Sequence, residues 1–297
     1  MNSRKKEIKN NSIPFIYGFV AILLVLMVII YPLIANIFNS FQTDTKNISQ
    51  VSAEFVGLKN YKSMLESGLL KISFKNSIIF TVSSVVFAVI IGFLLAALLN
   101  NIKKGRSFYR SILVLPWVIS PVVTGYAWRW LLNDKTGYIN ILLKKIGIIE
   151  DNILWLAKPN TALIAVVVGN IWRLFPFCMI MFLAALQSVP KELEEAAEID
   201  GANTLKKFIY IVIPQIKRVF TIVVLLGFIW NFNDYTLVQI MTKGGPLNST
   251  MVMPVLIRNL AFMNFRIGTG SALAVVLAVM LMILSIIYIR VIRVEID

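Results

Sequence analysis

The sequence predicts an all-α polytopic membrane protein with six transmembrane helices. Of its 297 residues, 58% are apolar and only 15% are charged, and the mean hydropathy is +0.79. Soluble domains carry about 25% charged residues, and uncharged apolar runs of about 20 residues are typical of membrane spans. Several such runs follow one another along this chain.

The first apolar run, 13–38, follows the basic residues Arg4, Lys5, Lys6 and Lys9. It is longer than the apolar region of a signal peptide and lacks a cleavage site followed by a soluble chain, so we expect a retained first span. The further spans are expected at 77–99, 111–132, 161–186, 219–242 and 267–289.

These spans divide the chain into segments. We expect a cytoplasmic N-terminal segment at 1–12, the first helix at 13–38, an extracytoplasmic loop at 39–76, a five-helix core at 77–289 with a cytoplasmic loop at 187–218, and a cytoplasmic tail at 290–297.

The distribution of charge predicts the orientation and argues against nucleic acid as a partner. The net charge is +14, a balance seen both in nucleic-acid-binding proteins and in membrane proteins with basic cytoplasmic loops. Here 100–110 holds Lys103, Lys104, Arg106 and Arg110 without an acidic residue. Basic loops stay in the cytoplasm, so we expect a multi-pass protein of a bacterial inner membrane, in contact with lipid, with both termini in the cytoplasm.

The residue inventory argues against an enzyme. Histidine is absent and Cys178 is the single cysteine, which excludes His-based catalysis, His-ligated metal sites and an internal disulfide. No P-loop, G-x-S-x-G or H-E-x-x-H pattern occurs, and a P-loop is the usual way to hold ATP phosphates. We therefore expect no catalytic residue, no metal and no cofactor bound by this chain.

The segment 187–218 is the most unusual in the sequence. Pro190 suits the start of a short acidic helix and Gly201 its left-handed end. A second amphipathic helix is expected to end before Pro214. The loop either lies on the inner membrane face or docks a protein partner, and its acidic first helix favours a partner with a basic groove over an anionic lipid surface.

These residues carry a resemblance. Glu195-Ala196-Ala197, then Gly201, then Ile211-Val212-Ile213-Pro214 resembles the EAA loop of permease subunits in bacterial binding-protein-dependent ABC importers. Matching stretches extend from Phe55 to the end and resemble the carbohydrate branch of that family; they begin at Phe55, Leu115, Trp128, Gly137, Leu186, Thr242 and Ser249.

The resemblance implies a type I ABC importer permease fold and a set of partners. These are a second homologous permease subunit, cytoplasmic ATP-binding cassette subunits that use ATP and Mg, an extracytoplasmic solute-binding protein and a sugar substrate. It also implies that the loop couples to the ATPase through Glu195, Ala196, Ala197, Asp200, Gly201 and Pro214.

Two ionisable side chains stand inside predicted spans, Arg173 in the fourth and Asp234 in the fifth. Such residues are costly in a bilayer and commonly mark functional sites, although these two could simply pair with one another or reach an interface. Asn231 and Asp234 are three residues apart, so we expect them on one helical face, flanked by aromatic residues. By position in the resembling family, the substrate-binding candidates are Trp117, Arg173, Leu174, Phe177, Trp230, Asn231 and Asp234.

The function expected from these patterns is translocation of a sugar, oligosaccharide or sugar derivative into the cell, driven by ATP hydrolysis in separate subunits. The alternative is a stand-alone secondary transporter or channel that uses Arg173 and Asp234 for ion coupling. No inverted repeat is evident in the spacing of the spans, and the acidic loop has no role in that alternative.

Overall fold

The computed structural model describes residues 17–44, 54–102 and 104–294. The segment 1–12 with its basic residues, Lys103 and residues 295–297 of the tail lie outside these ranges. Within them the chain is helical, and the pairing of Gln42 with Phe55 is an isolated bridge outside any strand. The chain divides into two compact units, residues 1–66 with 257–278 and residues 67–256 with 279–297.

The first unit contains an apolar helix and a hydrogen-bonded turn. The helix runs Tyr17–Asn39 and includes a π-helical turn at its middle. The helices of this unit are η1 (Leu26–Ile30), α2 (Tyr31–Asn39), α3 (Lys59–Glu66) and η3 (Asn259–Met263). Two further helices belong partly to each unit, α13 (Met253–Arg258) and α14 (Ile267–Val294).

A buried amide and a carboxylate hold the turn of the first unit, residues 40–44, in place. The Asn60 side chain donates to the carbonyl oxygens of Ser40 at 2.9 Å and Gln42 at 2.7 Å. Asp44 accepts from the Thr269 backbone N–H at 2.8 Å, the Thr269 hydroxyl at 2.7 Å and the Arg266 Nε at 2.9 Å. Burial raises the pKa of Asp44, but these donors outweigh it, so the pKa lies below its ordinary value.

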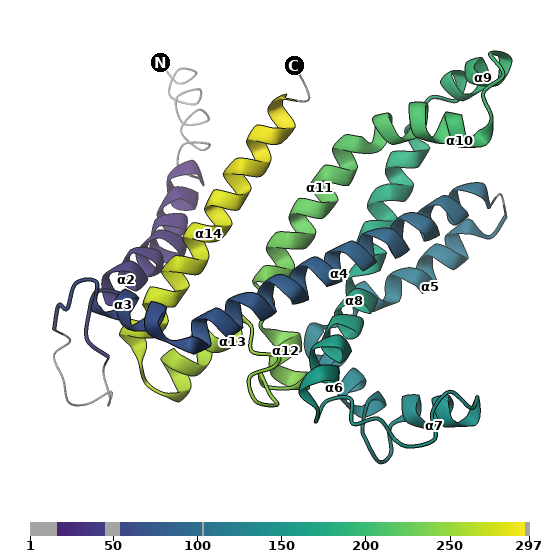
Figure 1. The fold of residues 1–297 in the computed structure, drawn as a ribbon. Helices are drawn as coiled ribbons and strands as arrows, with labels where there is room; N and C mark the ends of the chain where they lie inside the picture. Colours follow the sequence, from purple (N-terminus) through teal and green to yellow (C-terminus); the bar gives the residue numbers. More distant parts are fainter. Residues whose placement is uncertain (1–16, 45–53, 103, 295–297) are drawn as a thin grey trace, which may run out of the picture. The chain divides into compact units, whose positions relative to one another are not determined.

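The second unit is a helical bundle. Its helices are α4 (Gly68–Asn101), α5 (Arg106–Val118), α6 (Pro121–Leu131), α7 (Tyr138–Lys145), α8 (Pro159–Gln187), α9 (Lys191–Ile199), α10 (Thr204–Lys207), η2 (Phe208–Val212), α11 (Ile213–Phe232) and α12 (Thr236–Met241). Figure 1 shows α9 and α10 at one end of this bundle and α6 and α7 at the other.

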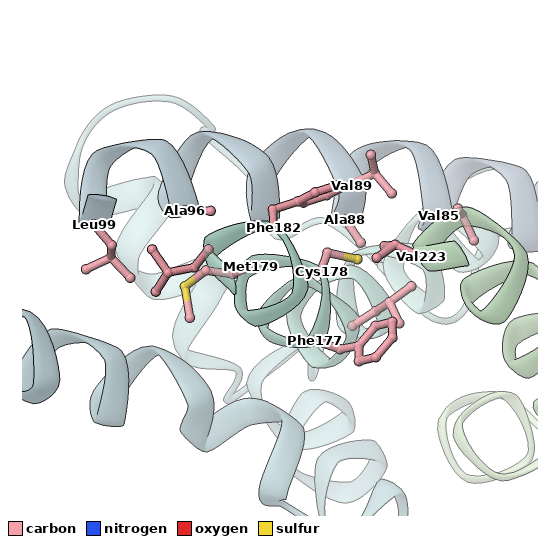
Figure 2. Packing of buried hydrophobic residues seen from close by; sticks show 12 residues of the cluster. Val85, Ala88, Val89, Ala96, Leu99, Phe177, Cys178, Met179, Phe182 and Val223 are labelled. Atoms are coloured by element: carbon pink, nitrogen blue, oxygen red, sulfur yellow. The ribbon is translucent and has the colours of Figure 1, made fainter. Parts of the chain in front are cut away.

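The apolar core of the bundle lies where α4 crosses α8, with α11 beside them. Figure 2 shows Ala88 and Val89 of α4 facing Cys178 and Phe182 of α8, with Val223 reaching in from α11. Small residues let the two long helices approach closely, as at many helix contacts in membranes.

Gly92 marks the closest approach of α4 and α8. A Cβ added there would lie 2.6 Å from the Cβ of Cys178 and 2.8 Å from the backbone nitrogen of Met179. Because backbone atoms cannot move aside, the crossing requires glycine at this position.

The membrane spans follow the prediction in number. Among the described residues, five helices are long and apolar enough to cross a membrane, and the bent pair α5 and α6 makes six if it is one span. The predicted second span, 77–99, lies inside α4, which begins nine residues earlier at Gly68.

The third span is not the single straight helix expected at 111–132. It consists of α5 and α6, which meet at an angle of 92°. Ile119 and Ser120 adopt extended backbone conformations, because a residue before proline is disfavoured in the helical region and Pro121 lacks the N–H that would continue the ladder. Pro121 instead begins α6, and the Ser120 hydroxyl accepts from the Val122 N–H at 3.3 Å.

The prediction that the second loop helix ends before Pro214 is wrong. The helix continues from Thr204 to Phe232, and the π-helical turn η2 directly precedes Ile213 and Pro214. A proline inside a helix lacks an N–H and crowds the carbonyl one turn earlier. The wider π-turn relieves that crowding, so the helix passes through Pro214 without ending.

Candidate functional site

Two features of the second unit could carry function, an exposed loop and a polar cavity. The loop is α9 with the turn that follows it. Gly201 has a φ of +78°, the left-handed conformation expected from the sequence. The Ala202 N–H donates to the Ala197 carbonyl at 2.9 Å and the Gly201 N–H to the Glu198 carbonyl at 3.0 Å. This pair of bonds is a Schellman motif, which ends α9 sharply.

The turn is joined to the helix that follows. The Asn203 side chain accepts from the Lys206 N–H at 2.9 Å and so caps α10. Lys207 forms an ion pair with Glu198 of α9. These contacts connect α9 to the continuous helix Thr204–Phe232, which is long and apolar enough to cross a membrane.

The predicted coupling residues lie together on this loop and are open to contact. Glu195, Ala196, Asp200 and Gly201 are exposed and Ala197 is half-buried. Ile199, next to them in α9, is 88% exposed. Pro214 lies further along the chain, as the second residue of α11.

The polar cavity has a volume of about 280 Å³, near the lower end of the range for small-molecule sites. Its walls come from α5, α6, α8, α11 and α12. The lining residues are Trp117, Pro121, Arg173, Leu174, Trp230, Asn231, Asn233, Asp234, Tyr235 and Thr236. The cavity therefore brings together six of the seven predicted substrate residues.

The seventh predicted residue, Phe177, lies behind the cavity wall. Its ring centroid is 4.8 Å from that of Trp230 and 6.0 Å from that of Trp117. Phe177 is buried, whereas the two tryptophans are each nearly half exposed. Phe177 thus supports two aromatic rings that border the cavity.

Arg173 and Asp234 form an ion pair in the cavity wall, which is one of the two arrangements expected from the sequence. The Arg173 side chain is 23% exposed and that of Asp234 only 6%. Arg173 also donates to the Asn170 side chain at 3.0 Å. Both of these contacts use Nη2, and the buried Nε of Arg173 has no hydrogen-bond partner among the described residues, so its N–H is an unused donor.

Asp234 is not on the helical face predicted for it. The helix expected at 219–242 is broken: α11 ends at Phe232, and α12 begins at Thr236. Asp234 lies in the break and accepts from the Leu237 N–H at 3.2 Å. An aspartate is well suited to start a helix, and this local preference places the carboxylate opposite Arg173 and beside Asn231.

Asn170 was not predicted and holds the polar cluster together. It is fully buried, donates to the Asn231 side chain and accepts from Arg173. Asn170 stands three residues before Arg173, on the same face of α8, and that spacing is the sequence signal that identifies it. Asn233 and Thr236 also line the cavity and were not predicted. Pro121 and Tyr235, the latter one of the aromatic residues expected beside Asp234, complete the lining.

The second unit is an apolar bundle with a polar, aromatic-bordered cavity between its helices and a structured loop at one end. This combination is typical of a multi-span membrane transport protein. The chain belongs to the family of binding-protein-dependent transport system inner membrane components, whose profile matches residues 77–294. This finding confirms the resemblance stated from the sequence.

Individual relatives cover nearly the whole chain. A probable ABC transporter permease protein of Brucella suis biovar 1 is 31% identical over 95% of this chain and 97% of its own. The trehalose/maltose transport system permease protein MalF of Thermococcus litoralis is 31% identical over 90% of this chain and 89% of its own.

The fold matches a solved transporter. A chain in the crystal structure of a bacterial alginate ABC transporter, in complex with an alginate-pentasaccharide-bound periplasmic protein, superposes with a TM-score of 0.82. The match covers 95% of this chain and 94% of the other, at 21% sequence identity. It confirms the predicted fold, that of a type I ABC importer permease.

Proposed function

We propose that the chain is the permease subunit of an ABC importer that moves a sugar, oligosaccharide or sugar derivative into the cell. The single observation that carries the proposal is the cavity of about 280 Å³ between α8 and α11, with amides, one ion pair and two tryptophans at its wall. A relative that is 31% identical is a trehalose/maltose permease, which supports the sugar class.

The cavity offers the groups that a sugar requires. The Asn233 side chain donates to the Ile229 carbonyl at 3.1 Å, and its oxygen remains an acceptor for a sugar hydroxyl. The Asn231 amide is held by Asn170 and by the Gly227 carbonyl and gives the wall its polar floor. Trp117 and Trp230 present half-open aromatic faces, which suit the apolar face of a pyranose ring. Because Arg173 and Asp234 neutralise one another, the lining carries no net charge and accepts an uncharged sugar without an unpaired ion.

The loop supplies the coupling to ATP. In this proposal two ATP-binding cassette subunits use ATP and Mg, close on one another and move α9 through a groove that holds Glu195 and Gly201. Lys207, Glu198 and the Schellman turn join α9 to the helix that ends beside the cavity. Movement of α9 therefore tilts α11 and changes which end of the cavity is open.

The remaining partners and the orientation belong to the same proposal. A second, homologous permease subunit completes the pathway, and a solute-binding protein delivers the sugar from outside. The basic loop at 100–110 and the α9 loop then face the cytoplasm together with both termini, in the inner membrane of a bacterium. The chain itself carries out no bond chemistry.

The test is to purify the tagged chain from its native membrane in mild detergent and to identify the co-purifying proteins by mass spectrometry. We expect a Walker-A ATPase and a second permease with an EAA loop. The Glu195→Lys variant should lose the ATPase, because it reverses a charge on an exposed coupling position, and retain the second permease.

A matched control for the loop is Glu150→Lys, which makes the same change at another exposed position of the second unit. This variant should retain both partners. Recovery of the ATPase with Glu195→Lys at the wild-type level would contradict the docking role of the loop.

A further inference from the structure

A second cavity, separate from the one between α8 and α11, lies at the end of the bundle away from α9. Its volume is about 440 Å³, within the range of small-molecule sites. It shares no lining residue with the first cavity. The walls are the end of α6, the segment before α8 and the turn after α12, and the lining residues are Arg129, Leu132, Asn133, Asp134, Leu154, Leu156, Ala157, Met241, Thr242, Lys243, Gly245 and Pro246.

Hydrogen bonds between segments hold two of these walls together. The buried Asn140 side chain accepts from Trp155 Nε1 at 2.9 Å and the Ile153 N–H at 3.3 Å, and donates to the Ile153 carbonyl at 3.0 Å. Asn152 donates to the Asp134 carbonyl at 2.6 Å. The segment before α8 is thereby fastened to the end of α6, so the cavity is part of the fold.

The third wall, the turn after α12, is also held in place by hydrogen bonds. The hydroxyls of Thr242 and Thr250 are 2.7 Å apart, and Thr250 donates to the Gly245 carbonyl at 2.7 Å. Asn76 of α4 donates to the Asn248 carbonyl at 2.9 Å, which ties the turn to the bundle. Lys243 is held in this turn with a φ of 56°, a conformation that residues with a Cβ seldom adopt.

The charged side chains of this cavity are Arg129 and Lys243, which are exposed, and Asp134, which is half-buried. Among the described residues, neither Arg129 nor Lys243 has an ion-pair or hydrogen-bond partner for its side chain, and the Asp134 carboxylate has none either. Two cations and one anion leave the lining with a net charge of +1. An unpaired excess of positive charge around a cavity attracts an anion.

The polar groups beside the cations narrow the chemistry of the ligand. Asn133 uses its side-chain oxygen to cap its own turn, with bonds of 2.9 Å from the N–H groups of Lys135 and Thr136. Its NH₂ group thus remains as a donor at the cavity, and Asp134 is an acceptor for hydroxyl groups. The apolar side chains of Leu132, Leu154 and Leu156 also belong to the lining.

We propose that this cavity is a second saccharide site that prefers a singly charged acidic sugar. The sugar carboxylate lies between Arg129 and Lys243, its hydroxyls bond to Asp134 and Asn133, and its apolar ring face packs on the leucines. Charge-assisted hydrogen bonds of a carboxylate to two cations supply the preference over a neutral sugar. The site goes beyond the proposed transport function and does not depend on it.

The experiment is isothermal titration calorimetry on the purified full-length chain, together with the subunits that accompany it, in lipid nanodiscs. D-Glucuronate and D-glucose are a matched pair of probes that differ in the carboxylate at C6. We expect glucuronate to bind at least tenfold more tightly than glucose, since the anion gains hydrogen bonds to charged groups, and the difference to shrink when salt is raised.

Three variants locate the site. Arg129→Gln and Lys243→Gln should each weaken glucuronate binding about tenfold. Asp134→Asn removes the one negative charge, while the amide oxygen of asparagine still accepts from a sugar hydroxyl. It should therefore strengthen the binding several-fold, and a gain of affinity cannot come from misfolding. Lys144→Gln, which removes an exposed cation outside the cavity, should leave the binding unchanged.

Two results would overturn the proposal. One is equal binding of glucose and glucuronate. The other is glucuronate binding that is lost in Asn231→Ala and unchanged in Arg129→Gln, which would place the ligand in the cavity between α8 and α11. Neither result bears on the co-purifying ATPase, so a failure here is distinct from a failure of the proposed function.

Discussion

Two regions of the bundle keep their shape in opposite ways: the crossing of α4 with α8, and the α9 loop. At the crossing, Gly92 lets two backbones meet, and the surrounding side chains are buried. In the loop, Glu195 and Ile199 are exposed, and the fold is maintained by hydrogen bonds within the loop itself. The crossing specifies a rigid body, whereas the loop presents a defined shape that the other described side chains leave exposed.

The difference indicates separate mechanical roles for the two regions. A rigid crossing moves as a unit, and a preformed exposed loop is the place where another protein can move it. The predictions below test first the rigid crossing, then the loop, then the cavity between α8 and α11, and last the turn of the first unit.

Gly92→Leu should lower the stability of the protein more than any other variant proposed here. The added side chain would meet the Cys178 Cβ and the Met179 backbone at less than 3 Å, and overpacking against backbone lowers the free energy of unfolding by about 3 kcal/mol or more. The check is the amount of monodisperse protein in detergent and its thermal unfolding. Gly18→Leu, where an added Cβ meets nothing within 4 Å, is the control, and equal stability of the two variants would refute the account of the crossing.

Gly201→Asp should abolish uptake while leaving the protein folded in the membrane. Gly201 has a φ of +78° and open space around it, so the substitution strains one turn by about 1 kcal/mol and adds a charge at the proposed docking surface. The measurement is ATP-dependent sugar uptake in vesicles, together with the membrane level of the protein.

Gly147→Asp is a close control for that variant. Gly147 has a φ of +73° and nothing within 4 Å of an added Cβ, so the backbone cost is the same, but Gly147 is not part of the α9 loop. Uptake should persist in Gly147→Asp. Equal loss in both variants would mean that backbone strain, rather than docking, explains the effect.

Asp234→Ala should lower the free energy of unfolding by an intermediate amount. It leaves Arg173 with Asn170 as its remaining partner among the described residues, and an uncompensated buried charge costs about 3 kcal/mol. Arg173→Met combined with Asp234→Ala should recover most of this loss, because no charge then remains. Thermal unfolding of the two single variants and the double variant measures the coupling, and additive losses would mean that the pair does not act as a unit.

The same Asp234→Ala variant should change the affinity for the transported sugar without releasing the partner subunits, because the carboxylate lines the cavity. Equilibrium binding to the purified complex checks this expectation. Unchanged affinity for every sugar that is transported would assign Asp234 a structural role alone.

Asp44→Asn should have the smallest effect, and one that depends on pH. The folded-state pKa of Asp44 is lowered by Thr269 and Arg266, so its contribution of about 1 kcal/mol is fully present above the ordinary aspartate pKa of about 3.9 and is lost as the pH falls through the lowered value. Thermal unfolding at pH 7 and pH 3 should show a difference between wild type and variant that shrinks at the lower pH. A difference that stays constant would contradict the assignment.

The sequence predicted the spans because long uncharged runs leave the backbone no alternative to helix in a bilayer. It also predicted the end of α9 at Gly201, since few residues other than glycine adopt that backbone conformation. The ion pair of Arg173 with Asp234 was among the alternatives because two charges in apolar spans need partners.

The errors arise where local and tertiary effects compete. A proline was expected to end the helix at Pro214, but the π-turn η2 accommodates it. The hydropathy pattern predicted α11 and α12 as one helix, and α5 and α6 as another. A break of two or three residues hardly changes the mean hydropathy over a window of about 19 residues. Asn170 was missed because a buried amide has no significance until the partner helix is placed beside it.

The most direct test of the central claim is a transport assay that compares the chain alone with the complex it purifies with. Both are reconstituted in sealed vesicles, with sugar outside and either ATP or an ion gradient supplied. The account predicts uptake by the complex that requires ATP and disappears with Gly201→Asp, and no uptake by the chain alone. Uptake by the chain alone under an ion gradient would contradict it and would identify Arg173 and Asp234 as an ion-coupling pair.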